Sequence, residues 1–175
     1  MPGVEAVIRR VPELVPASVI ESRDDMRAGR DLQKDVPFVT PDDFREAGAI
    51  AFGTPTRFGN VSAQLKNQID QLTPLWLKGE LEGKPAGVFI STGSLHGGQE
   101  VTHLTMMAPL LHLGMILVGV PYSVQELFTT QGGGSPYGAG HVAGGDSRRD
   151  IDAQEAAICR ALGRRLAEVG LRLQA

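Results

Sequence analysis

The 175-residue sequence contains a single cysteine, no long apolar run and no excess of basic residues. The lone Cys159 excludes an internal disulfide framework and a cysteine cluster for zinc, and it fits a reducing compartment. The longest apolar run, MILVGVPY, has the length of a strand and falls far short of the ~18 residues that indicate a membrane span. A net charge of −3 offers no basic surface for nucleic acid.

The N-terminus lacks the basic segment followed by an apolar segment that marks a signal peptide, so we expect a cytoplasmic protein. Cys159 lies within a helical pattern, which favours a packed apolar thiol over a reactive one. Hydrophobic residues make up 42% of the chain and charged residues 21%, as in ordinary globular proteins. No repeat or linker divides the sequence, and we therefore expect residues 1–175 to form a single domain.

Short apolar runs alternate with helical patterns along the chain. The runs predict four strands, at 4–11, 49–55, 86–92 and 115–121. The last three runs are continuous, so we expect those strands to be buried on both faces. Helices are predicted at 18–30, 40–47, 62–72, 99–114 and 152–170. This alternation is typical of an α/β fold in which helices cover both faces of a parallel sheet.

Several helix ends and faces carry local signals. Thr40 can cap the N-terminus of the helix that TPDDFREA begins, and Pro41 suits its first position. Gly114 is a plausible helix stop, whereas Pro109 predicts a kink or an interruption, because an interior proline costs about 3 kcal/mol. Helical spacing predicts three buried faces: Leu65, Ile69 and Leu72; Leu104, Ala108 and Leu111; and Ile158, Leu162, Leu166 and Val169.

Three loops rich in glycine, hydroxyl groups and proline follow predicted strands, at 53–60, 91–100 and 120–138. In an open α/β sheet, ligands bind beyond the carboxyl ends of the strands. Any one such loop could be a plain connection, but three loops on one edge favour a small-molecule site.

The chemistry of these loops narrows the ligand. We find no metal-binding cluster, no G-x-S-x-G elbow, no paired carboxylates and no G-x-x-x-x-G-K-[ST] loop, so no side chain is assigned as catalytic. The loops offer backbone N–H groups at Gly97 and Gly98, one guanidinium, and several hydroxyl groups and aromatic faces: Arg57; Thr56, Ser91, Thr92 and Ser94; Phe58 and Trp76. This set suits a planar ring with polar edges, in other words a cofactor that brings its own chemistry.

The order of motifs along the chain resembles a known family. From about residue 3 to the C-terminus, FGTPTRFGN, NQIDQL, LW, STGSLHGGQE, HLGM, QELF, SPYG and AGGD follow one another. Together they resemble the WrbA-type NAD(P)H:quinone oxidoreductases, which are flavodoxin-like FMN proteins. The resemblance implies an α/β three-layer sandwich with a parallel sheet, whose strand order in that family is 2-1-3-4-5.

The resemblance also implies site residues. The first flavin loop would be Thr56, Arg57 and Phe58, with Gly59 and Asn60 completing the turn. The second loop, at the pyrimidine edge of the flavin, would comprise Ser91, Thr92, Gly93, Ser94, Leu95, His96 and Gly97. It is one residue longer than is usual, which leaves the contacts of Leu95 and His96 open. His112 would help to bind the flavin, and Trp76 would line the substrate face near a neighbouring subunit's flavin. As alternatives, His112 caps a helix and Trp76 is a packing residue.

By resemblance, the protein would bind FMN non-covalently, take hydride from NAD(P)H and pass two electrons to a quinone by a ping-pong cycle in one shared pocket. It would form a homo-tetramer, with no nucleic-acid or membrane partner. The alternative is a truncated binding or scaffold subunit with weak or no FMN binding. A one-electron flavodoxin carrier is less favoured, because such carriers are strongly acidic.

One part of the family pattern has no match. Strand 1 and its phosphate loop are absent, and residues 1–13 match the family's second strand, so the domain is expected to be N-terminally incomplete and to bind FMN weakly. The true start could lie upstream of Met1, the chain could be a genuine truncation, or a partner could supply the missing pieces. We expect residues 4–10 to stay one strand-width from 49–53, leaving a slot, and not to pair with them directly.

Overall fold

A computed structural model describes residues 1–174 of the chain. Its sheet consists of parallel strands, β1 (Ile50–Pro55), β2 (Pro85–Thr92), β3 (Ile116–Leu117) and β4 (Ala139–Val142). β1 pairs with β2 along its whole length, from Ile50 opposite Ala86 to Pro55 opposite Ser91. β3 pairs with the start of β2 and β4 with its end. The strands β1, β2 and β3 are therefore neighbours in sequential order, and their parallel pairing confirms the predicted parallel sheet.

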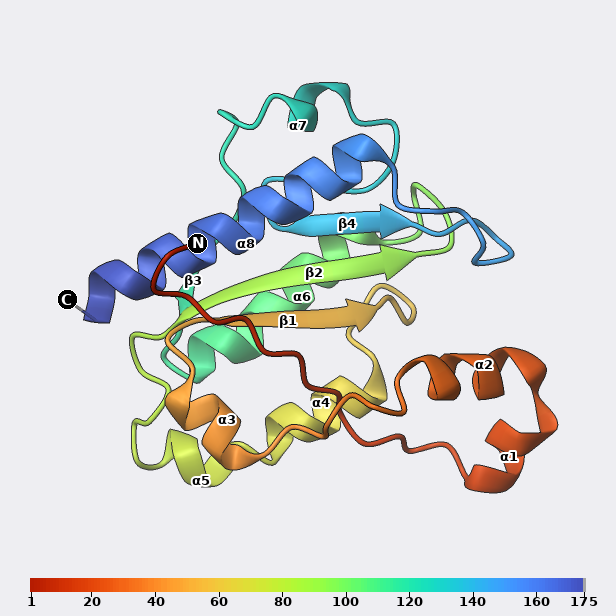
Figure 1. Ribbon diagram of the computed structural model, residues 1–175, viewed down its shortest axis with the longest axis horizontal. Coiled ribbons are helices and arrows are strands. Elements are labelled where there is room, and N and C mark those ends of the chain that lie inside the picture. The colour runs from red at the N-terminus through yellow and green to blue at the C-terminus, as the bar shows by residue number, and fades with distance from the viewer. Residues whose placement is uncertain (175) are drawn as a thin grey trace.

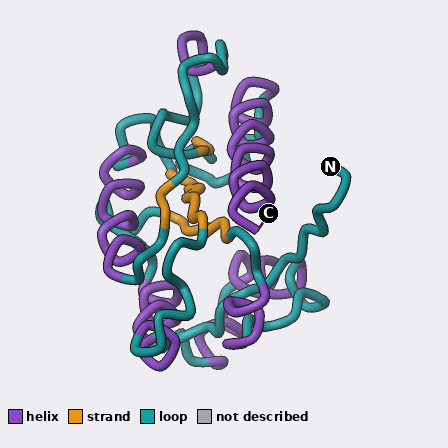
Figure 2. The backbone as a smooth tube through the Cα atoms, turned by 90° about the vertical axis from the view of Figure 1, so that its left-hand side faces the viewer, coloured by secondary structure: helices purple, strands orange, loops and turns teal. Residues whose placement is uncertain are grey.

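The helices form a layer on each face of the sheet (Figure 1; Figure 2). On one face lie α6 (Gln99–His112), α3 (Pro41–Glu46), α4 (Ala63–Asp70) and α5 (Thr73–Trp76), whose apolar side chains share one core with β1 and β2. The other face is covered by α8 (Ala153–Gln174), with α7 (Glu126–Thr129) beside it. α1 (Ala17–Ser22) and α2 (Asp24–Leu32) lie apart from the sheet at one corner (Figure 1). The expected three-layer α/β class is confirmed.

Several local predictions are confirmed. Thr40 and Asp43 form a capping box at the start of α3, with Pro41 in the first turn. Gly114 follows α6 with φ +77°, and the N–H groups of Gly114 and Met115 donate to the carbonyls of Leu111 and Leu110, which is a Schellman motif. The predicted faces of the helices near 65 and 160 are buried, with Val169 only partly so.

Residues 4–11 do not form the predicted strand. Arg10 makes an isolated bridge with Phe38, and residues 1–9 are exposed. A β-branched run becomes a strand only beside a partner strand, and within the described chain no backbone hydrogen bond joins 4–10 to β1. β1 is buried on one face only, with Phe52 and Thr54 buried and Ala51, Gly53 and Pro55 exposed, contrary to expectation.

Two further expectations were wrong, and a third is only partly tested. The face of α6 formed by Leu104, Ala108 and Leu111 is exposed, and the buried face contains Gln99, Thr102, His103, Met106 and Leu110. α6 runs through Pro109 without an interruption, so a kink at Pro109 stays a prediction. Cys159 is exposed, because it follows the buried Ile158 by one position and so points off the packed face of α8.

The sheet departs from the prediction in two strands. Only Ile116–Leu117 of the run at 115–121 forms a strand, although Val118 still donates to the carbonyl of Ala86. β4 was not predicted. Its sequence, AGHV, has little β-branched character, and it pairs with β2 through its backbone beside Phe89–Thr92.

Candidate functional site

The first loop is a tight turn at the carboxyl end of β1. The N–H of Arg57 donates to the carbonyl of Asn60 at 2.8 Å, and the N–H of Asn60 donates back to Arg57 at 3.1 Å. Phe58 and Gly59, the central residues, have φ values of +52° and +73°. A two-residue turn with both φ values positive normally contains asparagine or glycine. Phe58 instead presents a fully exposed aromatic ring on a strained backbone, which marks a candidate functional position.

The second loop follows β2 and is built around a buried hydroxyl. Thr92 donates from Oγ1 to the carbonyl of Ser94 at 2.9 Å and accepts from the side-chain amide of Gln99 at 2.9 Å. Because both of these bonds are internal, Thr92 orders the loop and its hydroxyl is occupied. Ser94, Leu95 and His96 are exposed at the tip of the loop.

The two predicted flavin loops converge at the N-terminus of α6. The N–H of Thr56 donates to the carbonyl of Ser91 at 2.9 Å, and the hydroxyls of Thr56 and Thr102 are 2.7 Å apart. A Cβ atom on Gly98 would lie 3.1 Å from the Cα of Gly59. Glycine at position 98 thus permits the close approach of the loops, and its φ of +97° favours glycine as well. The expected convergence is confirmed.

Binding of a flavin ring between the two loops stays a prediction. The cavity that reaches this edge has Pro55, Arg57 and Ser62 in its wall, and none of its lining residues belongs to the second loop.

The third glycine-rich loop, 120–138, uses its glycines for packing. A Cβ on Gly133 would collide with the backbone of Gly140, and one on Gly138 would collide with the carbonyl of Val88. The backbone of this loop therefore lies directly against β4 and β2. Gly133 and Gly138 are thus required for packing of the loop against the sheet, and not for close approach to a ligand.

Trp76 and His112 lie together at a different place. Both line a cavity of about 550 Å³ with Ala108 and Pro109. α6 is 14 residues long, and at the helical rise its two ends are about 20 Å apart. His112 ends this helix, whereas the two loops meet at its start. A single copy of the chain therefore does not bring Trp76 and His112 to the loops.

Sequence reasoning missed two polar residues that organise the site. Gln99 is buried and donates to Thr92 and to the carbonyl of His141, while its side-chain oxygen accepts from the N–H of Gly134. Thr102, fully buried, holds the hydroxyl of Thr56. Their spacing of three residues at the start of a predicted helix places both side chains on one face, and this was the signal in the sequence that could have identified them. The apolar pattern instead predicted that the opposite face of α6 is buried.

A buried carboxylate fixes the chain on the β4 side of the second loop. Glu155 is 1% exposed and accepts hydrogen bonds from the N–H groups of Gly133 and Val142 and from the side chains of His141 and Arg149. Burial alone would raise the pKa of Glu155, but the hydrogen bonds from Val142, Gly133 and His141 outweigh it and lower the pKa to about 2. The group is therefore ionised at neutral pH.

The chemistry at the loop edge fits a flat ring with polar edges. No side chain among residues 1–174 caps the N-terminus of α6, so its first N–H groups have no partner within the helix and face the edge with the positive end of the helix dipole. Phe58 adds an exposed aromatic face and Arg57 a positive charge. These donors and this aromatic face suit the isoalloxazine ring of a flavin, whose polar edge accepts hydrogen bonds.

Fold and site together define a flavodoxin-like α/β protein with a candidate flavin edge. The chain belongs to the NADPH-dependent FMN reductase family, whose model matches residues 34–129. It is 47% identical over 175 residues to an NAD(P)H dehydrogenase (quinone) from Trichlorobacter lovleyi. This alignment covers 99% of this chain and 85% of the relative. A protein of the same name from Solidesulfovibrio magneticus is 45% identical over 177 residues, and the alignment covers 100% of this chain and 87% of that protein.

The fold has a solved counterpart. The crystal structure of a flavodoxin, WrbA-like protein from Agrobacterium tumefaciens aligns with a TM-score of 0.59 and 22% identity, over 75% of this chain and 71% of that one. The flavodoxin-like fold and the family resemblance are thereby confirmed. No helix among residues 1–174 has both the length and the apolar character that crossing a membrane requires.

Proposed function

We propose that the chain binds FMN non-covalently at the carboxyl edge of the sheet and reduces quinones with NAD(P)H. The observation that carries this proposal is the convergence of the loops at 56–60 and 91–98 on the uncapped start of α6. Membership of an oxidoreductase family and two relatives named NAD(P)H dehydrogenase (quinone) support it.

Bound flavin would supply the hydride chemistry, and the residues of the chain would hold the ring and its charge. Phe58 would lie against one face of the ring, and the N–H groups of Ser94, Leu95 and His96 would donate to its pyrimidine edge. Arg57 and the start of α6 would stabilise the negative charge that collects at this edge during turnover. NAD(P)H and the quinone would then use one pocket in turn, which gives ping-pong kinetics.

Trp76 and His112 would serve the site of a neighbouring copy. Val101, Leu104 and Leu111 expose 46%, 48% and 59% of their surface along one side of α6, an apolar strip that suits contact between copies. We infer a homo-tetramer in which the Trp76 cavity of one copy faces the loops of another. Sedimentation equilibrium of the 175-residue chain measures this directly, and a monomer at micromolar concentration would contradict it.

Flavin titration and steady-state kinetics test the central proposal. We expect NADPH oxidation that depends on both added FMN and 1,4-benzoquinone, with parallel double-reciprocal plots. We expect FMN to bind with a dissociation constant above ~1 μM. In the described chain, the glycine-rich loop that leads directly into a helix would contact the flavin ring, so its N–H groups would not hold the phosphate. Absence of FMN-dependent turnover would overturn the proposed activity, and sub-micromolar affinity would contradict the weak binding.

Replacement of Trp76 tests its assignment. Trp76→Ala should lower quinone turnover by about 5- to 150-fold while leaving FMN retention nearly unchanged, since stacking of a flat ring on an aromatic side chain is worth about 1–3 kcal/mol. Leu77→Ala is the control, because Leu77 is exposed next to Trp76 and does not line the cavity. Equal quinone kinetics in Trp76→Ala and the parent, both loaded with FMN, would remove Trp76 from the substrate face.

A second candidate function is a binding or scaffold protein that takes up little or no flavin. It is favoured by the open edge of β1, which meets a cavity and no strand among residues 1–174. The flavin absorbance of the purified chain after incubation with FMN separates the two candidates. A colourless protein without turnover would favour the scaffold.

A further inference from the structure

Thr102 lies on the buried face of α6, in the first turn of the helix. Its side chain is fully buried, and its hydroxyl has a single hydrogen-bond partner among residues 1–174, the hydroxyl of Thr56 at 2.7 Å. A threonine within a helix can instead donate to a carbonyl three or four positions earlier, as Thr105 does to Thr102. Because the hydroxyl of Thr102 makes no such bond within the described chain, its hydrogen has Thr56 as its one available acceptor.

The burial of Thr102 decides which of the two hydroxyls is the donor. A hydroxyl hydrogen that is buried without an acceptor costs free energy, because it has lost water and gained no partner. If Thr56 were the donor, the hydrogen of Thr102 would be left in that state. Thr56 is only partly buried, so its own hydrogen can bond to water or to a ligand. The favourable arrangement therefore has Thr102 donating and Thr56 accepting.

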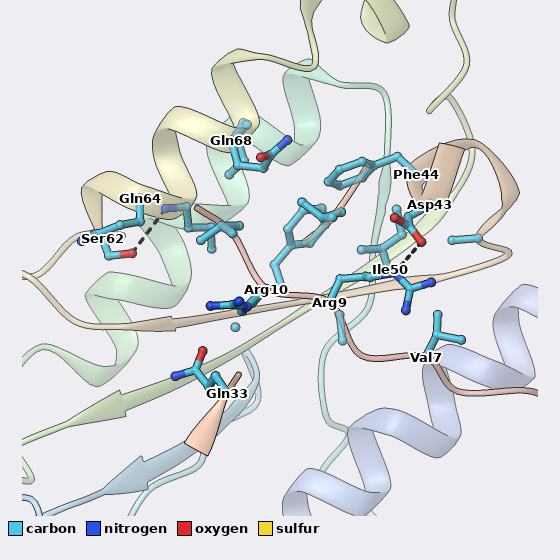
Figure 3. A pocket seen from close by; sticks show the side chains of 18 of the residues that line it. Val7, Arg9, Arg10, Gln33, Asp43, Phe44, Ile50, Ser62, Gln64 and Gln68 are labelled. Carbon is cyan, nitrogen blue, oxygen red and sulfur yellow. Dashed lines mark hydrogen bonds and ion pairs between the residues drawn. The ribbon is translucent and has the colours of Figure 1, made fainter. Parts of the chain in front are cut away.

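Other hydroxyls beside the first loop are used within the chain. Thr54 donates to the carbonyl of the next residue at 2.8 Å and accepts from the N–H of Ser62 at 3.0 Å. The hydroxyl of Ser62 accepts in turn from the N–H of Leu65 at the start of α4 (Figure 3). The hydroxyl of Thr56 differs from these, because its hydrogen has no acceptor among residues 1–174 once Thr102 donates to it.

The free hydrogen of Thr56 lies where the two predicted flavin loops meet. A Cβ atom on Gly98 would be 3.5 Å from Oγ1 of Thr56, so this hydroxyl lies beside the residue that precedes α6. The strained turn with its exposed Phe58 begins directly after Thr56. A hydrogen-bond donor at this position suits a ligand with acceptor atoms along its edge, as a flavin ring has.

We propose that Thr102 is a positioning residue that acts through Thr56. By donating to Oγ1 of Thr56, Thr102 holds this hydroxyl in one orientation and leaves its O–H to donate to an acceptor oxygen or nitrogen of bound flavin. Fixing the donor before the ligand arrives reduces the entropy that is lost on binding. The assignment rests on the proposed FMN site, since flavin would supply the acceptor. Thr102 itself would not contact flavin, because its side chain is fully buried.

The direction of the bond can be tested without flavin. In a mixture of equal volumes of H₂O and D₂O, a threonine whose hydroxyl exchanges slowly gives two ¹³Cβ NMR signals, and one whose hydroxyl exchanges fast gives a single averaged signal. We expect two signals for Thr102 and one signal for Thr56 in the 175-residue chain, because a buried, hydrogen-bonded group is protected from exchange. Two signals for Thr56, or one for Thr102, would overturn the assigned direction.

A double-mutant cycle of FMN affinity tests whether Thr102 acts through Thr56. Thr56→Val and Thr102→Val each replace a hydroxyl by a methyl group, and each should weaken FMN binding by about 3- to 10-fold in a flavin titration. The variant with both substitutions should bind within about twofold of Thr56→Val alone, because the effect of Thr102 passes through Thr56. Losses that multiply would mean that Thr102 acts independently of Thr56, and they would overturn the proposal.

Thr102→Ser is the matched variant, since it keeps a hydroxyl at position 102 and should retain the FMN affinity of the parent within about twofold. If Thr102 served packing alone, Thr102→Ser, which leaves a gap, would weaken binding more than Thr102→Val, and that order would overturn the proposal. A parent chain that binds no FMN would overturn the proposed function, and with it the role of Thr102 toward flavin. The exchange of the two hydroxyl hydrogens would still decide the direction of their bond.

Discussion

The two flanks of the sheet are stabilised in different ways. On the β4 side, residues 132–140 are largely buried, and Glu155 ties the chain down from within. On the β1 side, none of residues 1–39 is buried, and polar surface contacts join the segment to α3 and α4: the ion pair of Arg9 with Asp43 and the hydrogen bond from Gln64 to Glu13. The difference shows that a buried, fully hydrogen-bonded carboxylate and close glycine packing can anchor irregular chain, whereas a segment joined by surface charges stays exposed.

The largest expected effect comes from removing the charge at the anchored flank. Glu155→Gln should lower the free energy of unfolding by about 3–5 kcal/mol, because Arg149 and several N–H donors would lose a buried ionised partner. Chemical denaturation measures the change. Glu168→Gln, at an exposed position of the same helix, is the control and should cost less than about 0.5 kcal/mol. A loss below 1 kcal/mol for Glu155→Gln would remove the asymmetry between the flanks.

The same carboxylate predicts an acid-sensitive flank. The folded-state pKa of Glu155 is about 2, below its ordinary value of 4.5. Its contribution to stability is therefore complete above pH 4.5 and is lost as the pH falls toward 2. The loss should reach about 3 kcal/mol, and it should be missing from Glu155→Gln. Urea denaturation at a series of pH values across this window measures it, and parallel pH profiles of parent and variant would refute it.

Much of the fold follows from short-range signals. Thr40, Pro41 and Gly114 mark helix ends through local side-chain and backbone preferences. The buried face of α8 follows from the helical spacing of its apolar residues. The edge rule for parallel sheets correctly predicted that the loops after β1 and β2 meet.

The failures depend on partners that are distant in the sequence. Residues 4–11 have the composition of a strand, but a strand also needs a neighbour, and the pattern does not say whether one is present. Gln99 and Thr102 are buried because loops more than seven positions away supply their hydrogen bonds. Likewise, only the three-dimensional arrangement shows that His112 and Trp76 lie at the far end of α6. Their roles at the flavin stay predictions.

A smaller loss of stability is expected from removing the capping box of α3, which lies on the β1 side of the sheet. Thr40 accepts from the N–H of Asp43, and Asp43 accepts from the N–H of Thr40, so both groups at the start of α3 are satisfied. Thr40→Ala should cost about 1 kcal/mol of unfolding free energy. Ser22→Ala, which removes an exposed hydroxyl from the end of α1, should change it by less than about 0.5 kcal/mol. If both variants behave alike, the capping box does not anchor this flank.

The smallest change in stability should come from the ion pair that joins the N-terminal segment to α3. Arg9 contacts Asp43 at 2.7 Å with side chains 32% and 17% exposed, and pairs of this kind contribute about 0.5 kcal/mol. Arg9→Ala should therefore leave the midpoint of unfolding almost unchanged. Arg9→Ala should still release residues 4–9, because few other contacts hold this segment. Limited proteolysis should therefore cleave residues 4–9 faster in the variant than in the parent, whereas the rate of cleavage within 130–142 should not change. Arg23→Ala breaks an exposed pair with Asp25 outside this joint and should leave both cleavage rates unchanged. A loss of more than about 2 kcal/mol in Arg9→Ala would mean that the segment is integral to the core, and the two flanks would then be stabilised to a similar degree.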